Sequence, residues 1–231
     1  MRNSRYILLM RHSKHITNPT VTGFILSSFM AFIVSCAPSD LVIEGSVPVP
    51  MIKKIPVQIS VYYPDAFLNF VHTETSEEIG DWQIDLGKQN SDFFRSLFGS
   101  MFDEAVAIEK WGGDASDGPI TNTQAVLVPR IKKYGFLTPF VSGLGFYSAS
   151  IEYELTLYDV RGAAILSWTV VGYGKSEGKV FAKEEAVEQA TLLAIRDAGA
   201  RIAIEFDKQK AFESWFGKLV DTEDGGKIES L

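Results

Sequence analysis

The chain has 231 residues, of which 46% are apolar and 22% are charged, a composition typical of a globular protein rather than a disordered one. Its formal net charge is −7, and without residues 1–35 it would hold 18 basic against 29 acidic side chains, a net charge of about −11. Because such a surface repels phosphate backbones, the composition argues against a nucleic-acid partner.

The N-terminal residues have the three parts of a secretory signal. A basic region without any acidic residue ends near Lys14, and an apolar run follows at 21–34. A membrane-spanning helix needs roughly 20 apolar residues, so this run of about 14 is short for a permanent anchor and suits a signal-peptide core. We therefore expect residues 1–35 to be a signal peptide, with translation starting at Met1 or Met10.

The apolar run ends in Ile33-Val34-Ser35-Cys36, which contains the chain's single cysteine. This stretch resembles the lipobox of bacterial lipoprotein signal peptides. The resemblance implies that Cys36 carries a diacylglyceryl thioether, that cleavage occurs before it, and that its new amine is acylated. Residue 37 is Ala rather than Asp, which by the same resemblance favours the outer membrane with the body in the periplasm. The alternatives are an uncleaved membrane anchor and a buried structural cysteine.

The segment 36–56 contains four prolines, at positions 38, 48, 50 and 56. Proline removes backbone donors and favours extended conformations. We therefore predict a lipidated Cys36 followed by a stiff tether that lifts the domain off the membrane. The alternative is that the apolar residues of this segment form an edge strand of the domain.

The body is predicted to be one α+β domain at 57–220, followed by an acidic flexible tail at 221–231. Alternating apolar residues predict strands, and apolar residues at a spacing of three or four predict helices. A polar loop with Glu74, Glu77 and Glu78 follows the first strand. The expected order is β-α-β-β-β-α, with helices on one face of the sheet. The elements are strands at 57–62, 124–131, 151–158 and 163–173, helices at 91–102 and 183–206, and a short amphipathic piece at 211–219.

Two apolar stripes are predicted to pack on the sheet. In the first helix Ser91 is the expected N-cap, and the stripe is Phe94, Leu97, Phe98, Met101 and Phe102. In the second helix the stripe is mainly alanine: Ala186, Val187, Ala190, Leu193, Ala194, Ala198 and Ile202.

The body also resembles small outer-membrane lipoproteins of Gram-negative bacteria. The likeness rests on Phe93–Phe102, on the hairpin Ile151–Tyr173 with its Asp159–Gly162 turn, and on the alanine-rich helix. That group includes lipopolysaccharide-assembly lipoproteins, auxiliary lipoproteins of transport systems and activators of peptidoglycan synthases. No functional residue transfers from this resemblance beyond the lipobox.

The residues that could carry enzyme chemistry are few. Without the signal, His72 is the sole histidine, no free thiol remains, and a zinc site lacks ligands. The stretch Gly172-Tyr173-Gly174-Lys175-Ser176 ends like a phosphate loop, but the first glycine that the motif needs is Thr169. Its glycines are instead expected to let a strand end and turn. We predict no catalytic residue, no metal site and no cofactor.

The stretch Tyr134–Tyr147 is interrupted by glycine and carries five aromatic residues between two predicted strands. Apolar side chains on a loop need either a partner or a place in the core. One reading is a loop packed over its own sheet. The other is a contact surface for a protein partner or an acyl chain, with Phe136, Phe140, Phe146 and Tyr147 as the binding residues.

The predicted function is therefore that of a membrane-anchored, non-enzymatic envelope lipoprotein. It would be held in the membrane by acyl chains on Cys36 and would bind or help to assemble a partner complex in the periplasm. The alternative is a periplasmic binder of a small apolar ligand or a hydrolase that uses carboxylates alone.

Overall fold

The computed structural model describes residues 39–112, 122–177 and 182–228 of the chain. Its helices and mixed sheets confirm the α+β class. The main sheet has five strands in the order β5-β2-β6-β7-β8, and a second sheet has three strands in the order β1-β4-β3. The strands of the main sheet are β2 (Ile55–Tyr62), β5 (Phe102–Ile108), β6 (Ala125–Leu137), β7 (Tyr147–Asp159) and β8 (Ala164–Ser176).

Strands β6, β7 and β8 form an antiparallel meander, whereas β2 pairs in parallel with both β5 and β6. The predicted hairpin is confirmed, and both of its strands are longer than expected. At its turn the Asp159 carboxylate accepts the amides of Arg161 and Ala163, and Gly162 adopts a φ of 89°. A left-handed φ of this kind is one that glycine adopts without steric cost.

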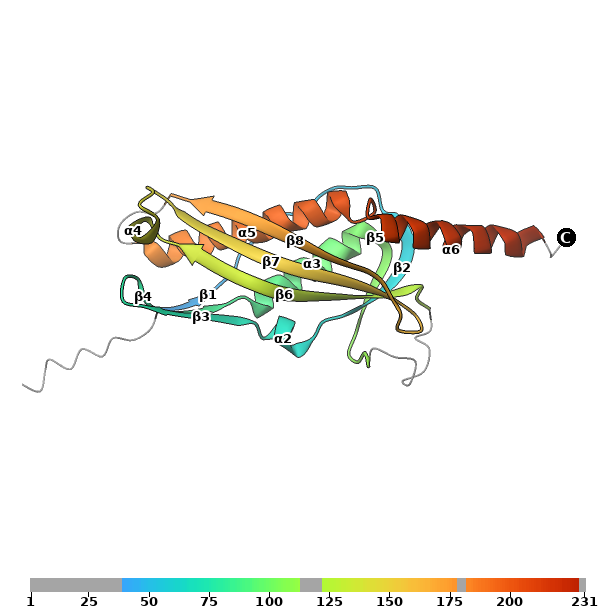
Figure 1. Ribbon diagram of the computed structural model, residues 1–231, viewed down its shortest axis with the longest axis horizontal. Coiled ribbons are helices and arrows are strands. Elements are labelled where there is room, and N and C mark those ends of the chain that lie inside the picture. The colour runs from blue at the N-terminus through green and yellow to red at the C-terminus, as the bar shows by residue number, and fades with distance from the viewer. Residues whose placement is uncertain (1–38, 113–121, 178–181, 229–231) are drawn as a thin grey trace, which may run out of the picture. The chain divides into compact units, whose positions relative to one another are not determined.

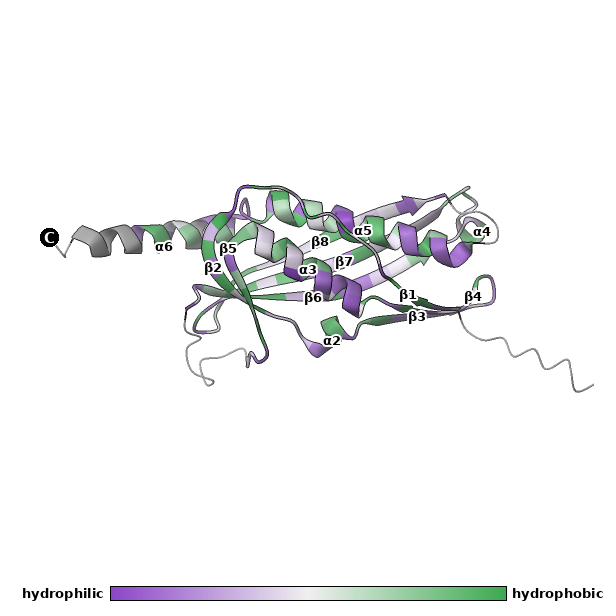
Figure 2. Ribbon diagram, turned by 180° about the vertical axis from the view of Figure 1, so that it is seen from behind, coloured by the Kyte–Doolittle hydropathy of each residue, from purple (hydrophilic) through white to green (hydrophobic). Residues whose placement is uncertain are grey.

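Helices α3 (Gly87–Met101) and α5 (Lys183–Glu205) cover one face of the main sheet (Figures 1 and 2). The predicted aromatic stripe of α3 is confirmed as core, because Phe94, Leu97, Phe98, Met101 and Phe102 are fully buried. Helix α3 begins before the expected N-cap Ser91, at Gly87, whose amide donates to the Asp85 carboxylate over 3.0 Å.

The alanine stripe of α5 is also buried, except that Leu193 is exposed rather than packed on the sheet as expected. Gly172 and Gly174 of β8 lie directly beneath this stripe. A Cβ atom on Gly174 would come within 1.8 Å of the Ala190 carbonyl oxygen, and one on Gly172 within 2.1 Å of the Ala194 carbonyl oxygen. The two glycines therefore allow close helix–sheet contact, and the expectation that they end the strand is wrong, since β8 continues to Ser176.

The predicted tether is partly wrong. Residues Ser39–Val42 form strand β1, which pairs in parallel with β4 (Gly80–Asp85), as the edge-strand alternative anticipated. Ile43 is fully buried, and its amide donates to the Asp85 carbonyl over 3.1 Å. The folded body accordingly includes described residues from Ser39 onward, ahead of the start predicted at residue 57.

Two further elements differ from expectation. The predicted polar loop with Glu74 and Glu77 is a β-hairpin of β3 (Val71–Ser76) and β4, in which Glu74 lies on β3. At the other end of the chain, helix α6 (Lys210–Ile228) runs into the segment predicted to be a flexible tail. The remaining helices of the described residues are the single turns α2 (Asp65–Leu68) and α4 (Pro139–Ser142).

Candidate functional site

Two hollows lie where β6 and β7 are joined by α4. We call the first the tip pocket; it has a volume of about 540 Å³ and lies between the β3–β4 turn, α4 and the start of α5. We call the second the open-face hollow; it has a volume of about 520 Å³ and lies on β6, β7 and β8. Both volumes fall in the range of small-molecule pockets, roughly 300–1,000 Å³.

The connection between β6 and β7 is a short, well-capped turn. The Thr138 hydroxyl accepts the Val141 amide over 3.4 Å, Pro139 occupies the first helical position, and Gly143 ends the helix with a φ of 66°. These are the residue types that favour each position in a helix of this kind. The turn exposes Phe140, whose side chain is 75% accessible, together with Val141 and Leu144.

The tip pocket is lined mainly by apolar and aromatic side chains. Trp82 from β4, Phe140 from α4 and Tyr147 from β7 converge there, and Ile79 and Pro139 complete the apolar wall. Glu78 and Lys183 supply opposite charges, and the Lys183 ammonium lies 5.0 Å from the centroid of the Trp82 ring. This distance is within the range of a cation–π contact.

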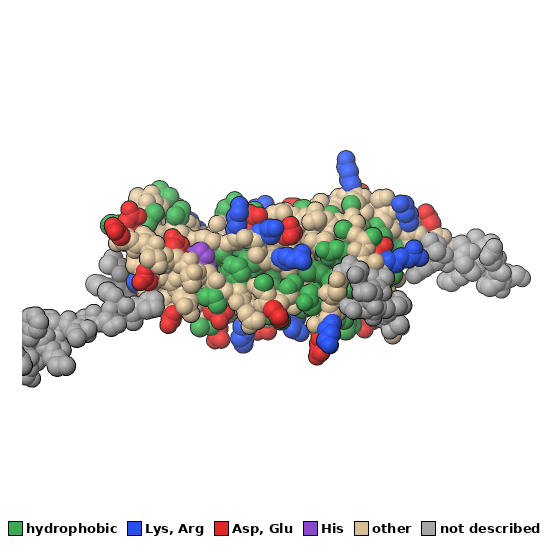
Figure 3. Space-filling view, turned by 60° about the horizontal axis from the view of Figure 1, so that its bottom comes forward, with side chains coloured by type: hydrophobic (Ala, Val, Ile, Leu, Met, Phe, Trp, Pro, Cys, Tyr) green, Lys and Arg blue, Asp and Glu red, His purple; other side chains and the backbone are tan. Residues whose placement is uncertain are grey.

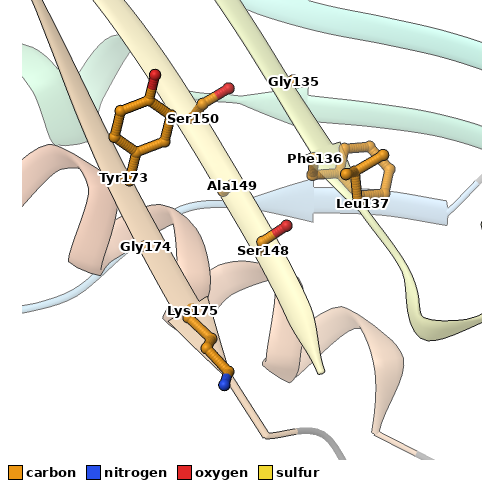
Figure 4. Close-up of a pocket in the computed structure, with 9 residues that line it drawn as sticks. All are labelled: Gly135, Phe136, Leu137, Ser148, Ala149, Ser150, Tyr173, Gly174 and Lys175. Carbon is orange, nitrogen blue, oxygen red and sulfur yellow. The ribbon is translucent and has the colours of Figure 1, made fainter. Parts of the chain in front are cut away.

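The open-face hollow has a floor of small side chains and a rim of large ones (Figure 4). Gly135, Ser148 and Ser150 form the floor. Leu137 and Tyr173 stand at the rim with 47% and 64% of their surface exposed. Lys175 projects from β8 at one end, where its ammonium lies 3.9 Å from the centroid of the Phe146 ring.

The four residues predicted to bind a partner are divided between core and surface. Phe136 and Tyr147 are buried, since β6 extends through residue 137 and β7 begins at residue 147. Phe136 packs against Trp82 with ring centroids 5.0 Å apart. Only Phe140 is largely exposed, and Phe146 is half-buried. The stretch expected to be a loop between two strands is therefore mostly strand, with a short turn at α4, and binding of a partner there stays a prediction.

Buried polar groups between the helices and the main sheet form hydrogen bonds with one another. The Tyr134 hydroxyl lies 2.7 Å from Thr191 Oγ1, which donates to the Val187 carbonyl. The Tyr153 hydroxyl donates to Asn90 Oδ1. Burial raises the pKa of Tyr134 and of Tyr153 well above the ordinary value for tyrosine. Both hydroxyls therefore stay protonated at neutral pH and link the helices to the sheet.

His72, the only histidine in the described part of the chain, is engaged in packing. Its Nε2 lies 3.2 Å from Glu74 Oε2, and its ring packs edge-on against Tyr134 at 5.0 Å. Within the described ranges, no three His, Cys, Asp or Glu side chains come together as a metal site. Nor does any helix in the described part of the chain have the length and apolar character needed to cross a membrane.

Three residues of the site were missed by sequence reasoning: Trp82, Tyr173 and Lys183. Trp82 belongs to a hairpin that the sequence did not reveal, and Lys183 reaches the pocket from the first residue of α5. Tyr173 is the last residue of a predicted strand, in a glycine-rich stretch where the phosphate-loop reading fails. Its exposure between two buried glycines follows from the alternation of a strand, which could have been recognised. Cys36 lies outside the described residues.

No protein-family model matches the chain, and no curated protein matches it in sequence. Among solved structures it is similar to a Xanthomonas campestris protein of the family DUF330, with 14% identity and a TM-score of 0.44 over 82% of this chain and 99% of that one. It is also similar to a hypothetical protein from Chlamydia trachomatis, with 16% identity and a TM-score of 0.37 over 64% and 96% of the two chains. Lipoprotein GNA1162 from Neisseria meningitidis is 12% identical, with a TM-score of 0.31 over 59% and 96%. No function follows for the chain from these resemblances.

Proposed function

We propose that the chain is a non-enzymatic lipoprotein of the bacterial outer membrane, anchored through acyl chains on Cys36, which binds a protein partner in the periplasm. The observation that carries this proposal is the lipobox-like stretch Ile33-Val34-Ser35-Cys36, followed three residues later by the first strand of the folded body. Two or three acyl chains anchor a protein stably, whereas one chain does so only marginally.

Replacing Cys36 with serine is expected to abolish lipid labelling and to leave uncleaved precursor in the inner membrane. The physical reason is that the thioether needs the cysteine sulfur, and cleavage before residue 36 follows that modification in lipoproteins. Labelling with a radioactive fatty acid and an immunoblot of separated membranes measure both effects. Normal cleavage and labelling of the variant would refute the lipid anchor.

The open-face hollow is the proposed site for the protein partner. Tyrosine is enriched at the centres of protein interfaces, and Tyr173 and Leu137 stand exposed on either side of a polar floor. The edge of β8 is already occupied at this point, because the Tyr173 amide donates to Asp197 Oδ2 over 3.0 Å. A partner would therefore pack on the face of the sheet here rather than add a strand at its edge.

A double variant, Leu137→Ser with Tyr173→Ser, is expected to remove the partner from a crosslinked pull-down of the membrane-anchored protein. Both side chains are exposed, so each change should alter the free energy of unfolding by no more than about 0.5 kcal/mol. Val106→Ser is the matched control, because Val106 is 49% exposed on β5 at the opposite edge of the same sheet. Retention of the partner by the double variant would exclude this hollow as the binding site.

A further inference from the structure

The turn around α4 presents an exposed apolar surface, which we call the α4 tip and define as residues 138–146. Phe140, Val141 and Leu144 are 75%, 44% and 50% exposed. Figure 3 shows hydrophobic side chains at the end where Figure 1 places α4. Single exposed apolar residues are ordinary, but a cluster of them on one turn marks a contact surface.

The α4 tip also lies in an uncharged part of the sequence. No Asp, Glu, Lys or Arg occurs from Tyr134 to Ile151. A surface that enters the boundary between headgroups and acyl chains must avoid charged side chains at its apex, because burying a charge in apolar surroundings is costly. The exposed residues Phe140, Val141 and Leu144, which we call the apex of the tip, meet this requirement.

The residues behind the apex are those that favour a membrane interface. Trp82 and Tyr147 line the tip pocket, and tryptophan and tyrosine are the aromatic residues enriched at headgroup level. Lys183 and Lys175 lie behind the tip, where their long side chains can reach headgroup phosphates. Glu78 is the acidic residue that lines the pocket.

Ser39, the first described residue, lies beside this pocket. Ser39 is the register partner of Trp82 in the β1–β4 pair. The Ser39 hydroxyl donates to Glu184 over 3.3 Å and accepts from the Lys183 ammonium over 3.4 Å. Ser39 is the third residue after Cys36, and a fully extended chain covers at most about 11 Å over those three steps. The membrane that holds acylated Cys36 is therefore within reach of the tip pocket.

We propose that the α4 tip contacts the membrane leaflet that holds the acyl chains of Cys36, inserting Phe140, Val141 and Leu144 at the boundary of its headgroups. This inference rests on the lipid anchor of the proposed function. The acyl chains supply the affinity for the membrane. The tip instead fixes the orientation of the folded body, because a second point of contact stops the body from rotating about its anchor. The lipid surface is the occupant of the tip, and the open-face hollow remains free for a protein.

The test uses nitroxide labels on the acylated protein in vesicles of phosphatidylethanolamine and phosphatidylglycerol. Cys36 is the only native cysteine. Because acylation blocks its sulfur, a cysteine introduced at position 140 or 144 takes up the label alone. Phe140→Cys and Leu144→Cys are compared with Val106→Cys, an exposed apolar position on β5 away from the tip. Collisions of the label with oxygen, which concentrates in lipid, are measured against collisions with a water-soluble nickel complex.

The expected result is an oxygen-to-nickel collision ratio several-fold higher at positions 140 and 144 than at position 106. Equal ratios at all three positions, on protein that floats with the vesicles, would overturn the membrane contact and leave the anchor intact. In that case the tip would be assigned to a protein partner. If the protein carries two labels per chain and does not float with the vesicles, Cys36 is not acylated. That result would overturn both the proposed lipid anchor and the proposed membrane contact of the tip.

Discussion

Replacing Gly174 with alanine is expected to destabilise the folded body by about 3 kcal/mol, near the upper end of the usual cost of overpacking. The new Cβ atom would lie 1.8 Å from the carbonyl oxygen of Ala190 and 2.5 Å from the amide nitrogen of Ala194. These are backbone atoms of α5, so no side-chain rotation relieves the clash. The helix must move away from β8, which opens the contact along the alanine stripe.

Urea unfolding followed by circular dichroism measures this change. Gly99→Ala is the matched control: Gly99 is exposed in the last turn of α3, and a Cβ atom there meets nothing within 4 Å. Alanine in a helix interior is more favourable than glycine by roughly 0.5–1 kcal/mol, so the control is expected to gain stability. An unchanged unfolding midpoint for Gly174→Ala would contradict the close contact between α5 and β8.

The contact between α5 and β8 also shows which features of the fold can be predicted from the sequence and which cannot. The alanine stripe of α5 and the glycines of β8 are each visible in the sequence, and the helix and the hairpin of β7 and β8 are predicted from their periodicity. Their direct apposition was not predicted, because no local pattern reports which strand lies beneath a helix. Exposed Leu193 fits the helical spacing of the stripe as well as its alanines do, so spacing alone could not separate it from them.

The missed strands have weak local signals. Strand β3 reads Val-His-Thr-Glu-Thr-Ser and contains no fully buried residue, and β4 buries only Trp82 and Ile84. Strand β5 begins at Phe102, directly after the last residue of α3, without a glycine or proline to mark the boundary. The sequence predicts a tether around β1, because a proline-rich extended segment has the same sequence pattern whether it is free or packed on a domain.

The candidate site depended on these missed elements. The tip pocket brings Trp82 and Lys183 to a turn that lies within the predicted loop. The position of Ser39 beside this pocket depends on its pairing with Trp82. Parallel pairing between residues so far apart in the chain leaves no trace in local periodicity. The sequence does reveal the aromatic stretch. Its prediction as a loop, however, overlooks the strand-like alternation at Tyr134 and Phe136.

The aromatic residues of that stretch are divided between core and surface, which leads to a second prediction with a large effect. Phe136→Ala is expected to lower the free energy of unfolding by roughly 3–5 kcal/mol, because it deletes a buried ring that packs against Trp82 and His72. Phe140→Ala, only four residues away, removes an exposed ring and is expected to cost no more than about 0.5 kcal/mol. Chemical denaturation of the two variants beside the unmodified protein measures the difference.

Phe136→Leu serves as the control, since it keeps an apolar side chain in the cavity and should recover part of the loss. A total stability of about 5–15 kcal/mol leaves the Phe136→Ala protein folded or only just unfolded, so the contrast is measurable. Equal losses at 136 and 140 would mean that Phe140 is packed rather than exposed. The α4 tip would then offer neither lipid nor protein the aromatic side chain on which its proposed contact depends.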